Sequence, residues 1–375
     1  MSKRRRKLSV KKTVRNVLVL IIITVLLLNM NNIVNVFRSK ITGYDIDTIE
    51  VFNELNIYND VKKYEHSDTL ERIVKTEYYN GKYLNEYVNI EFHDDGTFLS
   101  NINSLLGMGY KASEINTIYD KLSLDGINSV LDNDYYNDIV NVLNLKYFNR
   151  DNIDRYLILS TKNKELSYED LVTYVNIGLD KEYYTDVVNV SKKDDILVIV
   201  NKYHFLGKDY VPSDLVAIDK KYNRGNNNLL RKEAKEAFEK MCKAALDDKI
   251  TIYSGSAYRS YSYQQNLYNR YVASDGFKKA ETFSARAGYS EHQTGLATDI
   301  LNSKLDYISA SDKEYDWLIN NSYKFGFILR YPKDKEEITG YMYEEWHFRY
   351  VGVDVADEVY KSKLTYDEYV ARNFW

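Results

Sequence analysis

The chain has 375 residues, of which 44% are hydrophobic and 28% are charged. It is long enough for one or two globular domains with a sizeable core, which excludes global disorder. Eight lysines and arginines lie in residues 1–15, so the remainder carries 43 basic against 55 acidic residues. This acidic body excludes general nucleic-acid binding, which needs a basic surface to replace counterions along the phosphates.

An apolar stretch at residues 16–37 follows the basic tip at residues 1–15. About twenty residues let a helix cross the hydrocarbon core, and flanking basic residues favour the cytoplasmic side. We therefore expect an uncleaved single-pass anchor in the cell membrane, with a cytoplasmic N-terminus and an extracytoplasmic catalytic part. A cleaved secretory signal is the alternative, although no small-x-small cleavage site is present. No cysteine follows the apolar stretch, which excludes a lipoprotein anchor.

Residues 38–193 are rich in tyrosine, asparagine and aspartate, contain no proline, and alternate amphipathic stretches with short polar breaks. The segment DYYNDIVNV at residues 134–142 recurs as EYYTDVVNV at residues 182–190. Helical units of this length stack side by side to bury a shared face. We expect a mostly helical, repeat-like region that acts as a spacer or binds a protein partner. Its tyrosines could also stack on sugar rings, but such spacing favours a core role. His66 and His93 are interpreted as ordinary surface residues.

The pattern changes at residues 194–375, which we expect to form the catalytic domain. Residues 196–200 and 249–253 are β-branched runs typical of strands. Residues 228–247 have helical periodicity, and we expect a second helix at residues 262–273. This alternation predicts an α+β fold. The single cysteine, Cys242, falls on the first of these helices and is interpreted as a small buried residue.

Two of the five histidines stand in dense polar segments, around His292 and His347. Hydrolytic zinc sites use three imidazole or carboxylate ligands and leave a fourth position open to water. His292, Asp299 and His347 can supply that set, and Glu344 can supply the carboxylate that moves protons. Spacing alone does not establish the site. His292 and Asp299 are seven residues apart, and Glu344 and His347 are three residues apart, so neither pair lies on one face of a strand.

The motif Ser290-x-His292-x-x-Gly295-x-Ala297-x-Asp299, followed by Glu344-x-Trp346-His347, resembles the VanY-type D-alanyl-D-alanine carboxypeptidases of the LAS group of zinc peptidases. The resemblance extends from about residue 198 to residue 353. It includes Arg259 and Gln264 upstream and the segments around Arg330 and Arg349 downstream. The family fold implies a small antiparallel sheet flanked by helices.

The resemblance also implies roles for seven side chains. The expected zinc ligands are His292, Asp299 and His347. Glu344 is the expected catalytic base and acid, rather than its neighbour Glu345. Arg259 is expected either to stabilise the oxyanion or to bind the terminal carboxylate of the substrate. Gln264 and Ser290 are expected to line the substrate pocket.

The implied activity is removal of the C-terminal D-alanine from peptidoglycan stem peptides outside the cell. An L,D-carboxypeptidase acting on tetrapeptide stems is one alternative, since those relatives share the metal motif. An inactive peptidoglycan-binding scaffold is another. Retention of Glu344 favours an enzyme.

Overall fold

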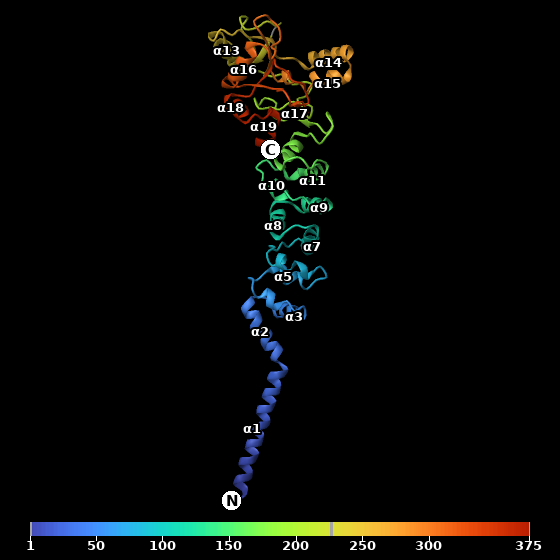
Figure 1. Cartoon of the computed structure of the whole chain (residues 1–375), viewed down its shortest axis with the longest axis vertical. Coiled ribbons are helices and arrows are strands. Elements are labelled where there is room, and N and C mark those ends of the chain that lie inside the picture. The colour runs from blue at the N-terminus through green and yellow to red at the C-terminus, as the bar shows by residue number, and fades with distance from the viewer. Residues whose placement is uncertain (1, 226–227, 375) are drawn as a thin grey trace. The chain divides into compact units, whose positions relative to one another are not determined.

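The computed structural model describes residues 2–225 and 228–374 (Figure 1). It divides into two compact units, Met1–Leu143 and Asn144–Trp375.

In the described residues of the first unit, every regular element is a helix, and turns and loops join them. Several of its helices begin at a polar residue whose side chain accepts a backbone N–H, as at Asp45, Ser67 and Ser123. Its elements are α1 (Ser2–Leu28), α2 (Met30–Thr42), α3 (Ile46–Glu54), α4 (Tyr58–Val61), α5 (Asp68–Ile73), η1 (Gly81–Tyr83), α6 (Leu84–Tyr87), α7 (Phe98–Met108), α8 (Ala112–Lys121), α9 (Leu124–Asp132) and α10 (Ile139–Leu143).

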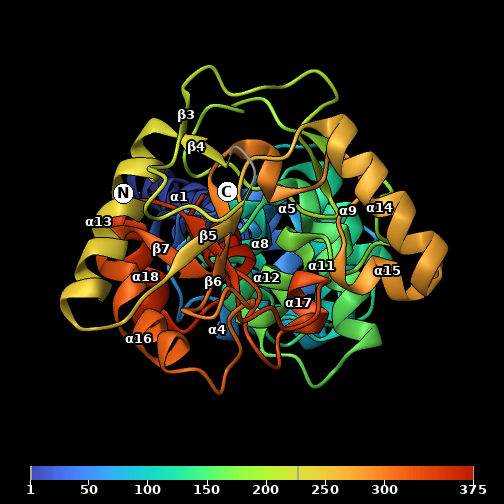
Figure 2. The same ribbon diagram turned by 90° about the horizontal axis from the view of Figure 1, so that it is seen from above.

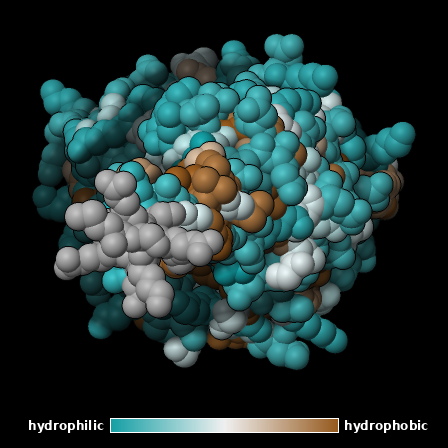
Figure 3. Space-filling model, turned by 90° about the horizontal axis from the view of Figure 1, so that it is seen from below, coloured by the Kyte–Doolittle hydropathy of each residue, from teal (hydrophilic) through white to brown (hydrophobic). Residues whose placement is uncertain are grey.

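The first two helices carry the apolar stretch. Their large apolar side chains are mostly exposed, from Val14 to Ile41. Among the described helices none is by itself long and apolar enough to cross a membrane, but Lys11–Leu28 and Met30–Thr42 together, bent by 54°, have the required length and composition. Figure 3 shows a largely hydrophilic face on which hydrophobic residues gather near the centre. The single straight transmembrane helix therefore stays a prediction.

The two echoing segments only partly share a structure. The helices that precede them, α9 and α12 (Tyr168–Ile177), both begin at a capping serine. Residues 134–142 then run into helix α10, whereas residues 182–190 contain the strand β1 (Val188–Asn189). The repeat also stays a prediction.

The second unit combines helices with a four-stranded antiparallel sheet, as the α+β expectation requires. The sheet order is β5-β6-β8-β7. The remaining elements are η2 (Arg150–Asn152), α11 (Ile153–Lys162), β2 (His204–Phe205), β3 (Leu215–Ala217), β4 (Leu229–Arg231), α13 (Lys232–Asp247), β5 (Tyr253–Ser256), α14 (Tyr261–Asp275), α15 (Phe277–Phe283), η3 (Glu291–Thr294), β6 (Ala297–Leu301), α16 (Lys313–Asn321), η4 (Ser322–Phe325), β7 (Phe327–Leu329), α17 (Glu336–Thr339), β8 (His347–Tyr350), α18 (Val353–Ser362) and α19 (Tyr366–Asn373).

Helices flank the sheet on two sides. In Figure 2, α13, α16 and α18 lie on one side of it, and α14 and α15 on the other. The predicted helices at residues 228–247 and 262–273 are α13, which begins later because β4 precedes it, and α14. The apolar stripe of α13 is buried in the core around Phe238 and Met241, and Cys242 is buried with it.

The predicted strand at residues 196–200 is wrong. These residues form a turn and irregular extended chain, although Val198 and Val200 are buried in the core. The guanidinium of Arg349 donates to the carbonyl oxygens of Ile196 and Val198, at 3.0 and 2.7 Å. Two of the five backbone carbonyl groups are thus satisfied by a side chain in place of a neighbouring strand.

The second unit begins ahead of the boundary expected near residue 194, because helix α12 packs on the C-terminal helix α19. Arg372 of α19 donates to Thr173 and to Asp170, both at 2.9 Å. The buried amide of Asn176 donates to the carbonyl oxygen of Ala371 at 3.3 Å. The last part of the helical region is therefore structurally part of the unit that carries the sheet.

Gly288 lies in the loop before η3 and packs closely against the ring of Phe205 in β2. Its φ is +87°, and a Cβ there would lie 2.1 Å from the ring of Phe205. Gly276 has a similar φ of +84° but nothing within 4 Å of a Cβ. Both Gly→Ala variants carry backbone strain of about 1–3 kcal/mol, and the ring contact adds about 1–3 kcal/mol at Gly288.

We therefore expect Gly288→Ala to lower the free energy of unfolding by at least about 1 kcal/mol more than Gly276→Ala. Denaturant unfolding of both variants measures the difference. Equal losses would mean that the Phe205 ring moves aside without cost.

Candidate active site

Two strands and a short helix bring the predicted metal ligands together. Asp299 in β6 and His347 in β8 are direct partners across the antiparallel pair. His292 lies in η3, and Gly295, with a left-handed φ of +69°, turns the chain from η3 into β6. A Cβ at Gly295 would lie 2.8 Å from Leu215, so this turn needs glycine. Strand pairing thus supplies the proximity that residue spacing could not establish.

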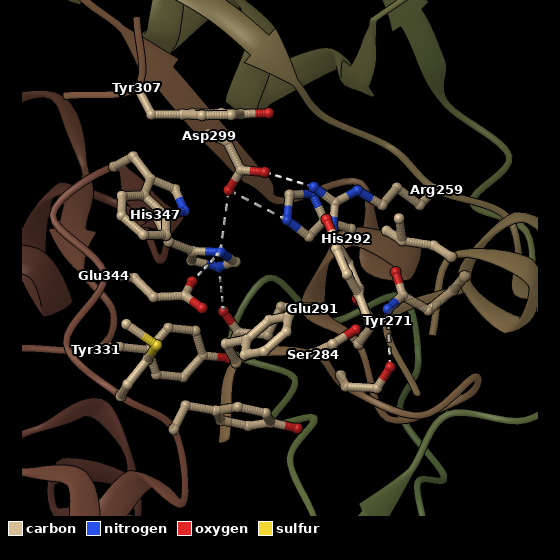
Figure 4. A pocket seen from close by; sticks show the side chains of 18 of the residues that line it. Arg259, Tyr271, Ser284, Glu291, His292, Asp299, Tyr307, Tyr331, Glu344 and His347 are labelled. Atoms are coloured by element: carbon tan, nitrogen blue, oxygen red, sulfur yellow. Dashed lines mark hydrogen bonds and ion pairs between the residues drawn. The ribbon is translucent and has the colours of Figure 1, made fainter. Parts of the chain in front are cut away.

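The three side chains converge on one oxygen atom. Asp299 Oδ1 lies 3.3 Å from His292 Nε2 and 3.3 Å from His347 Nδ1. The two imidazole rings stand nearly perpendicular, at 84°, and all three residues are buried. Figure 4 shows the three groups pointing toward one another, with Glu344 and Arg259 beside them. Their candidate ligand atoms lie within 4.8 Å of one another, close enough to hold one metal ion.

Each of these groups has a second partner that orients it. His292 Nδ1 lies 2.7 Å from the carbonyl oxygen of Ala257, which leaves Nε2 for a metal. Asp299 Oδ2 accepts a hydrogen bond from Arg259 Nη2. His347 Nε2 faces Glu291 Oε2 at 3.5 Å, which leaves Nδ1 for a metal.

The donor set fits zinc. Asp299 Oδ1 is buried and makes no hydrogen bond of good geometry among the described residues. Two imidazole nitrogens and one carboxylate oxygen are a set typical of catalytic zinc, with a fourth position left for water or substrate. Burial lowers the pKa of His292 to about 4, so this imidazole is neutral at neutral pH and able to bind a metal.

His347 differs from His292 in its protonation. Burial by itself lowers the pKa of His347, but the carboxylates of Asp299 and Glu291 outweigh it and raise the pKa to about 9. Without a metal this imidazole therefore holds a proton. Metal binding at Nδ1 must release it.

Glu344 is placed as a carboxylate beside the metal site. Its Oε2 lies 3.6 Å from His347 Nδ1. Its side chain is buried in the wall of a cavity that the three candidate ligands also line. Burial raises the pKa of Glu344 to about 8. A carboxyl group that gains and loses a proton near neutral pH suits general acid and base catalysis. Its neighbour Glu345 is partly exposed.

The other predicted residues line this cavity, which has a volume of about 420 Å³. Arg259 is fixed by Ser256 Oγ at 3.0 Å and by Asp299, so it also holds a ligand in place. Gln264 donates to the carbonyl oxygen of Ala285 at 2.8 Å, and its buried Oε1 makes no hydrogen bond among the described residues. Ser290 is buried at the cavity wall. The structure thus gathers all seven predicted residues around one cavity.

Glu291 is a site residue that the motif analysis did not single out. It is buried between His347 and two arginines, and its Oε1 accepts from Arg330 Nε at 2.7 Å and from Arg349 Nη1 at 2.9 Å. Burial raises the pKa of Glu291, but the two guanidinium groups outweigh it and hold the pKa below its usual range. The sequence signal that could have identified Glu291 was the presence of Arg330 and Arg349 in the segments that resemble the family, since buried arginines need an acidic partner.

A second group of possible ligands lies in the first unit around His66. Its Nε2 lies 2.7 Å from Glu71 Oε2 and its Nδ1 lies 3.6 Å from Asp68. Together the three groups are close enough for a cation. Because Asp68 and His66 are exposed and exposed carboxylates often cluster without an ion, we assign no metal there.

A buried centre of two imidazoles and one carboxylate, with a separate glutamate beside it, defines a metal-dependent hydrolase. Residues 227–353 match the family model described as VanY: D-alanyl-D-alanine carboxypeptidase. The protein YodJ of Bacillus subtilis (strain 168) is 40% identical over 187 residues, which are 48% of this chain and 68% of YodJ. The chain therefore belongs to the VanY family of D-alanyl-D-alanine carboxypeptidases.

Two solved structures also resemble part of the chain. The LdcB LD-carboxypeptidase shares 36% identity with a TM-score of 0.47, over 51% of this chain and 92% of LdcB. A mutant of the vancomycin resistance D,D-pentapeptidase VanY in complex with Zn(II) shares 34% identity with a TM-score of 0.41, over 46% of this chain and 98% of that protein.

Proposed function

We propose that this protein is a zinc carboxypeptidase that removes the C-terminal D-alanine from peptidoglycan stem peptides. The observation that carries the proposal is the position of Glu344, a buried carboxylate 3.6 Å from the ligand atom of His347. Membership of the VanY family supports the reaction and the substrate class.

His292 Nε2, Asp299 Oδ1 and His347 Nδ1 would hold the zinc. When bound there, zinc lowers the pKa of water and polarises the scissile carbonyl group. Glu344 accepts the proton of the attacking water and then donates it to the departing amino group of D-alanine. Burial raises the pKa of Glu344 to about 8 in the metal-free site, which favours a carboxyl group that can hold a proton and then donate it.

Three polar side chains serve the substrate end of the cavity. The guanidinium of Arg259 is held rigidly by Ser256 and Asp299, so it presents fixed positive charge to the substrate. It stabilises the oxyanion or binds the terminal carboxylate. Gln264 Oε1 and Ser290 lie where a hydrogen bond to the peptide end can form.

The experiment is mass spectrometry of stem peptides after incubation with the zinc-loaded full chain in detergent. We expect the pentapeptide stem to lose one alanine and the tetrapeptide stem to remain intact. Loss from the tetrapeptide would move the assignment to the L,D class. No loss from either stem with zinc bound would overturn the proposal in favour of a binding scaffold.

We also propose that the N-terminal helices hold the enzyme at the cell membrane, with the catalytic unit on the outer side. Exposed apolar side chains along α1 and α2, next to the basic residues Lys11, Lys12 and Arg15, support this. Residues 38–193 would then act as a spacer or bind a protein partner.

Membrane association can be measured by fractionating cells that express the full chain. We expect the wild-type protein to remain in the membrane pellet after an alkaline carbonate wash. The variant Ile21→Asp/Ile22→Asp should leave it, since each charge costs about 3 kcal/mol at the centre of a membrane helix. The exposed Leu124→Asp of α9 is the control. Release of the wild-type protein by the wash would contradict the anchor.

A further inference from the structure

A second, larger cavity of about 1010 Å³ adjoins the catalytic cavity within the second unit. Tyr341 and Met342 line both cavities. One wall of the second cavity is helix α15, and another is the segment at residues 179–184 that follows α12. This second wall lies outside residues 227–353 and therefore outside the part that matches the family model.

Lys202 joins the walls of this second cavity. Its ammonium group is buried and donates to the carbonyl oxygen of Glu281 in α15 at 2.9 Å. The same ammonium lies 4.3 Å from the ring centre of Tyr183 and 4.8 Å from that of Tyr341. One buried cation thus connects residues from three separate segments and fixes the shape of the cavity.

A second set of contacts fixes the wall formed by Tyr184. The guanidinium of Arg286 stacks over the Tyr184 ring at 3.8 Å, and its Nε donates to Glu281 Oε1 at 2.9 Å. Met342 N donates to the carbonyl oxygen of Thr282, which attaches the shared rim to α15. The cavity is therefore preorganised by interactions that do not involve the metal site.

Large apolar side chains remain exposed on these walls. Tyr183 is 41% exposed, Phe277 is 55% exposed and Met342 is 42% exposed. Exposed rings that flank a cavity with a fixed shape are suited to stacking on a flat, partly apolar ligand. The C–H faces of sugar rings have this character.

The charges around the second cavity balance. Its basic side chains are Lys181, Lys202, Lys278 and Arg286. Its acidic side chains are Glu182, Glu281, Glu336 and Glu337. A wall with four groups of each sign gives no net attraction for an acidic peptide, whereas carboxylates and amines both hydrogen-bond to hydroxyl and acetamido groups. The balance favours a neutral, polyhydroxylated ligand.

We propose that the second cavity is a carbohydrate subsite, which binds the amino-sugar unit to which the stem peptide is attached. This inference rests on the proposed function, because it assumes that the stem's C-terminus enters the catalytic cavity. An extended stem of five residues spans up to about 17 Å, which lets it leave the catalytic cavity across Met342 and place its sugar between Tyr183 and Phe277. The enzyme would then recognise both ends of its substrate.

The test compares two substrates: the free pentapeptide, and the same pentapeptide linked to its disaccharide. We expect Tyr183→Ala and Phe277→Ala in the full chain to lower kcat/KM for the glycan-linked substrate by about fivefold to tenfold each. For the free pentapeptide kcat/KM should remain unchanged. Leu246→Ala removes a side chain as exposed as Phe277, on α13 and outside both cavities, and should change neither value.

An equal loss on both substrates would overturn the carbohydrate assignment and indicate a peptide or structural role. No loss on either would overturn the subsite. A calorimetric titration of the full chain with the peptide-free disaccharide tests binding without turnover. Failure to cleave either substrate with zinc bound would refute the proposed function. In that case disaccharide binding that Tyr183→Ala abolishes would still support the subsite, and its absence would refute it.

Discussion

Replacing Glu344 by glutamine should lower kcat by about 10²–10⁴-fold, the range that general acid and base catalysis contributes. Glutamine keeps the size and polarity of the buried side chain but cannot accept the proton of water. Glu344 is not one of the candidate zinc ligands, which are His292, Asp299 and His347. The zinc content of the variant should therefore stay at the wild-type level. Steady-state kinetics with the pentapeptide stem, together with metal analysis of the same sample, measures both quantities.

Glu345→Gln is the matched control for this substitution. Glu345 is the next residue in the chain and has the same chemistry, but it is partly exposed, whereas Glu344 is buried at the cavity. The control should keep kcat within about twofold of wild type, because surface substitutions change local energies little. If Glu344→Gln retained a tenth of the wild-type activity, or if Glu345→Gln lost most of it, the assignment of the proton-transfer group would be wrong.

The sequence could predict much of the catalytic unit because its motifs specify chemistry residue by residue. The helix α13 follows from its 3.6-residue apolar period, and both α13 and α14 begin and end within a few residues of the expected positions. The candidate ligands His292, Asp299 and His347 follow from the motif. Their common meeting point does not, since it depends on the pairing of β6 with β8 opposite Asp299.

Other features could not be predicted because they depend on contacts between distant segments. The apolar run at residues 196–200 has strand composition, but the distant Arg349 donates to the carbonyl oxygens of Ile196 and Val198. Tyr183 belongs to a segment with the composition of the helical region, yet it packs against Lys202 of the catalytic unit. Composition describes what a segment can do locally, whereas these roles are set by tertiary contacts.

Substitution of Glu291, which lies among buried charges, should have a large effect on the stability of the fold. Glu291 is the common partner of two fully buried arginines, and Arg330 also binds Asp367 of α19 at 2.6 Å. Removing one member of a buried ionic network leaves the others uncompensated, which costs about 3–5 kcal/mol. We therefore expect Glu291→Gln to lower the free energy of unfolding by that amount in denaturant titrations.

The same substitution should also weaken zinc binding, because Glu291 Oε2 faces His347 Nε2 and orients the ring toward the metal. Loss of such an outer partner typically lowers metal affinity about 10–100-fold. Asp367→Asn separates the two effects, because Asp367 pairs with Arg330 and Asn201, whereas the carboxylate partners of His347 are Glu291, Asp299 and Glu344. It should destabilise the fold comparably and leave zinc affinity, measured by competition with a chelator, near the wild-type value. Equal zinc affinities in the two variants would show that Glu291 only neutralises the arginines and does not orient His347.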